Sequence, residues 1–165
     1  MSEHKEKRYA LRSEFEKEQS LSAQTDTQVY EAIRAALADA RTKAVVAVNT
    51  AMVGVYWEIG RQIAKAAGER AEYGRSLLAY LSERLTIEFG KGFTERNLRA
   101  MRQFYEVFPI RHTLRAELSW SHYRLLMRVE ELNRRQFYLT ESANEGWTSR
   151  QLERQIEEER GDDVE

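Results

Sequence analysis

The sequence predicts an all-α fold: a helical domain with a long N-terminal helix and a helix-turn-helix core. Helix-forming residues dominate the 165-residue chain, which has one proline and eight glycines. Apolar residues recur at steps of three or four, the spacing of one helical face, and no segment shows strand-like alternation. We expect one domain at residues 26–157, preceded by a flexible charged arm at 1–25 and followed by an acidic tail at 158–165.

The first helix is expected to begin after a cap at Thr25 or Asp26 and to reach about residue 66. Residues 1–25 alternate in charge and have few apolar anchors, which is typical of a frayed helix or a disordered arm. An unbroken helix would be about 60 Å long, more than a small core can cover. It therefore either breaks near Asn49–Thr50 or packs against another chain, which would make a homodimer through residues 27–66. Its apolar stripe consists of Val29, Ile33, Leu37, Ala40, Ala44, Val48, Met52, Val55, Ile59 and Ile63.

Other residues of this helix indicate packing. Gly54 and Gly60 lower the helix propensity but permit another helix to approach closely. Tyr56 and Trp57 are more typical of a core or of an oligomer contact than of a ligand-stacking pair. Glu58 beside them is a lone carboxylate without a second catalytic group.

Glycine, proline and capping residues divide the rest of the chain into shorter helices. Residues 67–74 form a loop, and Gly90 ends the helix that follows it. Thr94 is an N-cap for the next helix, which Pro109 terminates, and Gly146 ends a later one. The expected helices cover about residues 74–89, 95–108, 119–129 and 131–145, and a last helix starts after a cap at Thr148 or Ser149.

The helices at 74–89 and 95–108, joined by a short turn, have the layout of a helix-turn-helix. At about 100° per residue, Leu98, Met101, Phe104, Tyr105 and Phe108 fall on one side of the second helix. Arg96, Arg99, Arg102 and Gln103 fall on the other side, and these residue types bind phosphates and base edges. The candidate DNA contacts are Lys91, Thr94, Arg96, Arg99, Arg102, Gln103, His122, Arg124 and Arg128.

Two roles are expected within this set. Phosphate contacts would come from Lys91, Arg102, Arg124 and Arg128, and from Thr94 with the free N–H groups of its helix. Base contacts would come from Arg96, Arg99 and Gln103. His122 is either a local cap and packing residue or a phosphate contact. An ordinary surface helix would show the same spacing, because Glu95 with Arg99 and Arg102 with Glu106 are also i,i+4 ion pairs.

The charge distribution supports a basic centre, although the net charge is only −1. Residues 90–128 carry eight basic and three acidic side chains, whereas residues 129–165 carry five basic and eleven acidic ones. The absence of cysteine excludes thiolate metal sites and cysteine nucleophiles, and the three histidines lie in separate segments, so we predict no metal and no cofactor. Neither a signal core nor a membrane-spanning stretch is evident, so a cytoplasmic protein is expected.

Several uncommon strings run along residues 27–157. They are Asn49–Gly60, Tyr73–Gly74, Leu81–Leu85, Phe89–Phe93, Asn97–Leu98, Met101–Tyr105, Leu118–Arg124, Gly146–Trp147 and Arg150–Ile156. Together they resemble the N-terminal domain of YhcG-type proteins, predicted nucleases of the PD-(D/E)XK class. Residues 118–122 and 145–153 also resemble, more weakly, the DNA-binding part of ParB-like proteins. These resemblances imply a helical domain that acts on duplex DNA.

In YhcG-type proteins the nuclease lies C-terminal to this domain, and its metal site needs converging carboxylates and a lysine. This sequence has no strand-borne Asp…(Asp/Glu)-x-Lys motif after the last helix, and the consecutive acidic residues near its end do not supply one. We therefore expect a DNA-binding module that is not itself an enzyme and that acts alone or with a separate nuclease subunit. The alternative is an oligomerisation or protein-interaction module that does not contact DNA.

Overall fold

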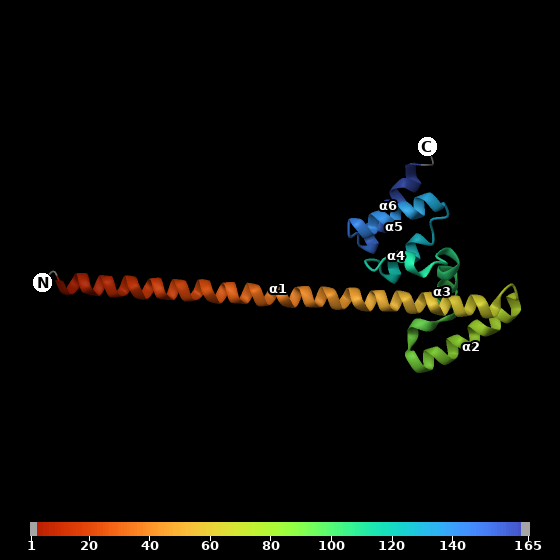
Figure 1. The fold of residues 1–165 in the computed structure, drawn as a ribbon, viewed down its shortest axis with the longest axis horizontal. Coiled ribbons are helices and arrows are strands. Elements are labelled where there is room, and N and C mark those ends of the chain that lie inside the picture. Colours follow the sequence, from red (N-terminus) through yellow and green to blue (C-terminus); the bar gives the residue numbers. More distant parts are fainter. Residues whose placement is uncertain (1–2, 163–165) are drawn as a thin grey trace. The chain divides into compact units, whose positions relative to one another are not determined.

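The computed structural model describes residues 3–162, and every element in that range is helical. The elements are α1 (Glu3–Ala67), α2 (Ala71–Phe89), η1 (Lys91–Phe93), α3 (Glu95–Val107), η2 (Arg111–Thr113), α4 (Trp120–Leu126), α5 (Leu132–Asn144) and α6 (Ser149–Asp162) (Figure 1). The all-α fold with a long N-terminal helix is thus confirmed. The chain divides into two compact units, Met1–Val45 and Val46–Glu165, called unit 1 and unit 2 below.

Unit 1 consists of the N-terminal part of α1, which is already helical at Glu3, so the expected helix start after Asp26 is wrong. Strong helix formers (Glu, Lys, Arg and Gln) fill much of the first 25 residues and sustain the helix there. Thr25 does not act as a cap, because its hydroxyl donates a hydrogen bond to the carbonyl oxygen of Leu21 at 2.9 Å. The flexibility of this arm stays a prediction.

The C-terminal part of α1 belongs to unit 2. The helix continues through Asn49–Thr50, so the alternative that predicted a break there is wrong. The Thr50 hydroxyl lies 2.9 Å from the carbonyl oxygen of Val46 and 3.2 Å from that of Ala116, so it links α1 to the segment before α4. The buried positions are Val53, Trp57, Gly60, Ile63 and Ala67. Most of the predicted stripe therefore faces elsewhere, and Val48, Met52 and Val55 are exposed.

Helices α2 and α3 begin and end at the residues that their local chemistry favours. α2 starts at Ala71, three residues earlier than expected, and ends at Phe89, where Gly90 follows as the C-cap with a φ of 91° that suits glycine. Thr94 is confirmed as the N-cap of α3, since its hydroxyl accepts a hydrogen bond from the Asn97 N–H. α2, η1 and α3 all contact one another.

The C-terminal helices are shorter or longer than the sequence pattern indicated. α4 ends at Leu126 rather than near Val129, and α5 ends before Gly146, which has a φ of 63°. α6 continues to Asp162, so residues 158–162 are helical, and the fraying of this acidic segment stays a prediction. Glu158 contributes to this extension, because its carboxylate lies 3.7 Å from Nε of Arg154 one turn earlier. Residues 163–165 of the predicted tail lie outside the described residues.

Two clusters of buried side chains form the core of unit 2. The larger cluster is made by α1, α3, α4, α5 and α6 together with the segments that flank α4, and the smaller one joins α1, α2 and α3. Trp57 is confirmed as a core residue: it is buried, and its indole N–H donates to the carbonyl oxygen of Phe108 at 2.7 Å. The smaller cluster consists of Ile63, Leu78, Leu98 and Met101.

Gly60 allows α1 and α3 to touch through their backbones. A Cβ atom built on Gly60 would lie only 1.9 Å from the carbonyl oxygen of Met101. The close approach that the sequence suggested for this glycine is therefore confirmed, and it positions α3 against α1. For Gly54 the nearest atom is Nη2 of Arg111 at 3.1 Å, which belongs to a side chain and not to a backbone.

Candidate nucleic-acid interface

α3 separates its apolar and polar side chains as the helical wheel predicted. Leu98, Met101 and Phe104 are buried in the core, while Arg96, Arg99 and Gln103 are exposed on the other side. The buried side holds the helix against α1 and α2. Consequently the three polar side chains are presented to solvent by a helix that cannot easily rotate.

α4 is short and mostly buried, and it adds further basic groups. Tyr123, Leu125 and Leu126 are buried in the larger cluster. Arg124 is only partly buried, and Arg128, just after the helix, is exposed. Because α4 contacts α3, these two arginines can reach the polar side of α3.

The two helices enclose a groove with a volume of about 500 Å³, which we call the basic groove. Its lining consists of Arg96, Arg99, Ala100, Gln103, Arg124, Met127, Arg128 and Glu130. Five of the nine predicted contact residues thus lie together, and they include four guanidinium groups beside a single carboxylate. Ala100 on α3 and the loop residues Met127 and Glu130 were missed, because nothing in the sequence alone shows which residues of α3 and of the segment after α4 lie against each other.

The arginines of the groove differ in their local partners. Arg99 forms an ion pair with Glu95 at 2.9 Å, and Arg128 lies 3.7 Å from a carboxylate oxygen of Glu153. Arg96 and Arg124 have no ion pair among the described side chains: no carboxylate oxygen there lies within 4.0 Å of either guanidinium group. Two of the four positive charges are therefore not neutralised within the described part of the chain.

The other four predicted residues lie outside the groove lining. Arg102 is partly buried and donates to Glu106 at 2.8 Å and to the carbonyl oxygen of Gly68 at 3.3 Å, so it braces the turn between α1 and α2. The Thr94 hydroxyl is engaged as the N-cap. Lys91 is exposed on η1.

The phosphate role considered for His122 does not fit its surroundings. His122 is buried with 8% exposure, its Nδ1 accepts a hydrogen bond from the Ser119 N–H at 3.1 Å, and its Nε2 lies 2.8 Å from the carbonyl oxygen of Trp147. The Nε2–H tautomer satisfies both contacts. His122 is therefore the local cap and packing residue of the other alternative: it ties the start of α4 to the segment before α6.

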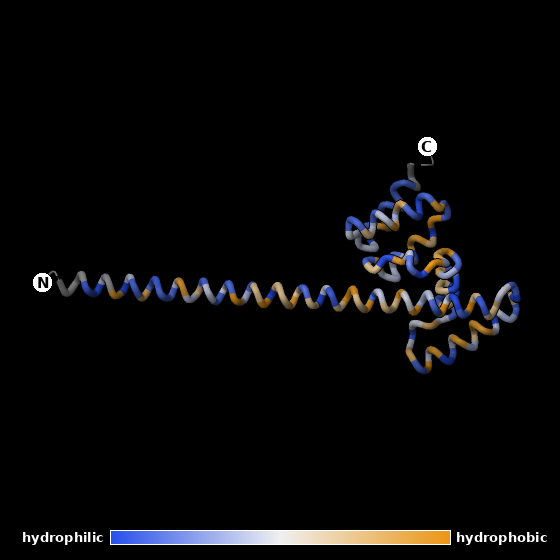
Figure 2. The backbone as a smooth tube through the Cα atoms, viewed as in Figure 1, coloured by the Kyte–Doolittle hydropathy of each residue, from blue (hydrophilic) through white to orange (hydrophobic). Residues whose placement is uncertain are grey.

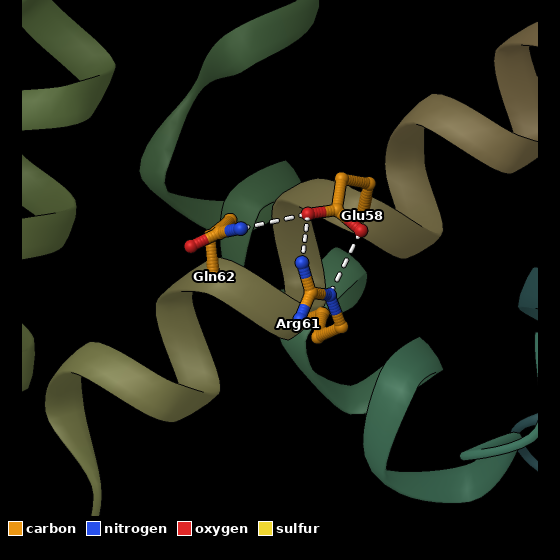
Figure 3. A network of polar contacts seen from close by, with 3 residues as sticks. All are labelled: Glu58, Arg61 and Gln62. Atoms are coloured by element: carbon orange, nitrogen blue, oxygen red, sulfur yellow. Dashed lines mark hydrogen bonds and ion pairs between the residues drawn. The ribbon is translucent and has the colours of Figure 1, made fainter.

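A second polar cluster lies on α1, where Glu58 accepts hydrogen bonds from Arg61 and Gln62 (Figure 3). The Nε atom of Arg61 lies 2.8 Å from one carboxylate oxygen, and Nε2 of Gln62 lies 2.7 Å from the other. The Arg61 bond, followed by the Gln62 bond, lowers the pKa of Glu58 from 4.5 to about 2. Its side chain is 38% exposed, so Glu58 is a paired surface carboxylate.

Acidification should remove the contribution that Glu58 and Arg61 make to stability. The pKa of Glu58 is lower in the folded chain than in the unfolded one, so its contribution to stability is present above about pH 4.5 and is lost as the pH falls toward 2. The Glu58→Gln variant should therefore lose less stability than the wild type between pH 5 and pH 2, by a small margin because the pair is exposed. Urea unfolding at several pH values measures this.

Gln62→Ala is the matched control for the pH experiment. It removes only the second of the two hydrogen bonds that lower the pKa of Glu58, so its pH dependence should lie between those of the wild type and Glu58→Gln. If Glu58→Gln and the wild type lose the same free energy of unfolding between pH 5 and pH 2, the prediction that the fold lowers the pKa of Glu58 is wrong.

Membrane-spanning and metal-binding features are both missing from the described residues. None of the helices there combines the length and apolar character that crossing a bilayer requires. No group of three or more His, Cys, Asp or Glu side chains in the described region is placed to hold a metal ion.

Comparisons with known proteins agree with the family that the sequence strings indicated. The model of the family described as "DUF1016 N-terminal domain" matches residues 32–160. The Escherichia coli (strain K12) protein named "Putative nuclease YhcG" is 35% identical over 164 residues, a match that covers 78% of this chain and 44% of that protein. The chain thus matches less than half the length of this relative. No solved structure matches. On this evidence, the chain belongs to the DUF1016 N-terminal domain family.

Proposed function

We propose that this chain is a DNA-binding module whose basic groove receives the phosphate backbone of duplex DNA. The observation that carries the proposal is the convergence of Arg96 and Arg99 on α3, Arg124 on α4 and Arg128 just after α4 on one groove. Guanidinium groups are planar and always charged, and they bind phosphate oxygens in bidentate fashion. A groove lined by four of them matches a polyanion better than a small neutral ligand.

The four arginines are available to DNA to different degrees. Arg96 and Arg124 can bind phosphate directly. Arg99 and Arg128 must exchange a protein carboxylate for a phosphate, but exposed ion pairs contribute only about 0–1 kcal/mol and are easily replaced. Glu95 and Glu153 therefore compete with DNA for these two arginines and lower its affinity slightly.

The neighbouring elements favour a helix-turn-helix mode of binding. α3 follows α2 and the short η1 turn, and it would enter the major groove with Gln103 toward the base edges. Lys91 on η1 is exposed and could reach a flanking phosphate. Arg96, Arg124 and Arg128 would fix the register on the backbone.

Binding without cleavage fits the composition of the groove. Arginine and glutamine contact phosphates but do not assemble a magnesium site, which needs several carboxylates. The relative from Escherichia coli is named a nuclease, and the match reaches only 44% of its length. The function we propose here is therefore delivery to DNA of a nuclease activity that other residues carry.

The salt dependence of DNA binding tests this proposal. Contact with about four phosphates predicts a fall in affinity of roughly hundredfold between 50 and 200 mM salt, because counterions are released. Fluorescence anisotropy with a labelled random duplex measures it, and single-stranded DNA of equal length is the comparison. Absence of binding at 50 mM salt, or binding that salt does not weaken, would contradict the proposal.

A second candidate function is protein interaction, and one observation favours it. Unit 1 exposes large apolar side chains along α1, among them Ile33 and Leu37. Such side chains are usually covered by a partner when they lie in a row. This function does not exclude DNA binding, since it uses a different unit of the chain.

A further inference from the structure

An apolar face on unit 1 lacks any cover among the described residues. Every described side chain between residues 7 and 45 is exposed, including Val29, Ile33 and Leu37, which are 52%, 55% and 57% exposed. Figure 2 shows apolar positions recurring along α1 between hydrophilic ones. Most of the stability of a helix in a protein comes from packing its apolar face. A partner that covers this face would therefore stabilise unit 1.

The apolar residues form one narrow stripe. At about 100° per residue, Val29, Ile33, Leu37, Ala40 and Ala44 fall within an arc of roughly 80°. Their steps of four, four, three and four residues repeat after eleven residues, because Ala40 and Ala44 follow Val29 and Ile33 at that interval. Eleven residues correspond to about three helical turns, so the stripe stays on one side and suits nearly straight helix pairing.

The charges beside the stripe indicate what kind of partner can cover it. Residues 26–45 contain three acidic and three basic side chains. Glu31 pairs with Arg34 at 3.5 Å, and Asp39 pairs with Lys43 at 2.7 Å within the same helix. This neutral surface has no excess charge to select an acidic or basic partner, and it does not repel an identical helix.

The sizes of the stripe residues are graded along the helix. Val29, Ile33 and Leu37 are large, and Ala40 and Ala44, which follow them, are small. In an antiparallel pair, Leu37 of one copy meets Ala40 of the other, and Ile33 meets Ala44, so both of these layers combine a large residue with a small one. A parallel pair would place Leu37 against Leu37 and Ala40 against Ala40, which leaves a crowded layer next to a gap.

We propose that residues 33–44 of α1 form an antiparallel helical dimer with a second copy of this chain, centred between Leu37 and Ala40. The dimer buries the stripe of both copies. It does not depend on the DNA-binding proposal, because the basic groove belongs to unit 2. Each dimer would carry two such grooves.

Sedimentation equilibrium of the full chain tests the association. The wild type should have twice the 19.4 kDa mass of one chain. Leu37→Asp places a charge in the stripe and should raise the dissociation constant by on the order of hundredfold. Ala35→Asp is the matched control, since position 35 lies about 160° away from Leu37 and the variant should remain dimeric. A monomeric wild type, or equal dissociation of both variants, overturns the proposal.

Spin labels test the orientation, and the cysteine-free sequence makes single labels unambiguous. In the antiparallel dimer the two copies of Thr27→Cys lie about 35 Å apart along the axis, and those of Thr42→Cys about 10 Å apart. Double electron–electron resonance measures both distances. In a parallel dimer each pair lies at the same level, so a short distance for Thr27→Cys would overturn the antiparallel arrangement.

Discussion

Replacing Gly60 with alanine is expected to destabilise the chain by about 3 kcal/mol. The new Cβ would meet the Met101 carbonyl oxygen at 1.9 Å and its carbon at 2.7 Å, so α1 and α3 would have to separate. Alanine favours a helix over glycine by about 1 kcal/mol, which is too little to offset that separation. Urea unfolding of the wild type and the variant measures the difference in free energy.

Gly54→Ala is the control for this prediction, because it makes the same change six residues earlier in α1. Its Cβ would lie 3.1 Å from Nη2 of Arg111, and the end of a long side chain can move away at little cost. We expect a change within about 1 kcal/mol in either direction. Similar destabilisation by both variants would show that a general packing defect, and not the contact with the Met101 backbone, is responsible.

Loss of Arg96 and Arg124 together is expected to weaken duplex binding by roughly hundredfold at low salt. These residues supply the two guanidinium groups of the basic groove that carry no ion pair among the described side chains. The slope of log affinity against log salt should also become shallower by about two, one unit for each phosphate that the variant no longer binds. Anisotropy titrations of the Arg96→Ala/Arg124→Ala double variant at several salt concentrations give both quantities.

The control for the double variant removes the same charge elsewhere in unit 2. Arg75 and Arg150 are exposed and do not line the groove, so Arg75→Ala/Arg150→Ala should retain most of the affinity. The companion variant Glu95→Gln/Glu153→Gln frees Arg99 and Arg128 and should bind DNA more tightly than the wild type. If the two arginine double variants lose equal affinity, DNA is bound by overall charge and the groove assignment fails.

The sequence predicted α3 well because its signals agree with one another. Thr94 caps the helix, Leu98, Met101 and Phe104 recur at helical spacing, and all three are buried. A wheel of one helix, however, does not show what lies next to it. Arg102 was grouped with Arg99 on geometry alone, yet a carbonyl oxygen from the α1–α2 turn and Glu106 engage its guanidinium.

The sequence left open which residues of α1 reach the core. Of the predicted stripe, Ile63 is buried and Ile59 packs against the smaller cluster, whereas Val53 and Trp57, which lie outside the stripe, are buried in the larger one. Periodicity could not distinguish the two faces, because both carry apolar residues at helical spacing. For His122 the sequence offers both a local cap and a phosphate contact, and the carbonyl oxygen of Trp147, 25 residues away, decides for the first.

The position of the three tryptophans has a practical consequence for anyone who follows the unfolding of this chain. Trp57, Trp120 and Trp147 all belong to unit 2 and pack in or against its larger cluster, and unit 1 has none. Indole emission therefore reports on unit 2 alone, whereas far-ultraviolet circular dichroism sums the helices of both units. The two optical signals are free to change at different denaturant concentrations, so a mismatch between them is a property of the architecture and not a sign of a partly folded core.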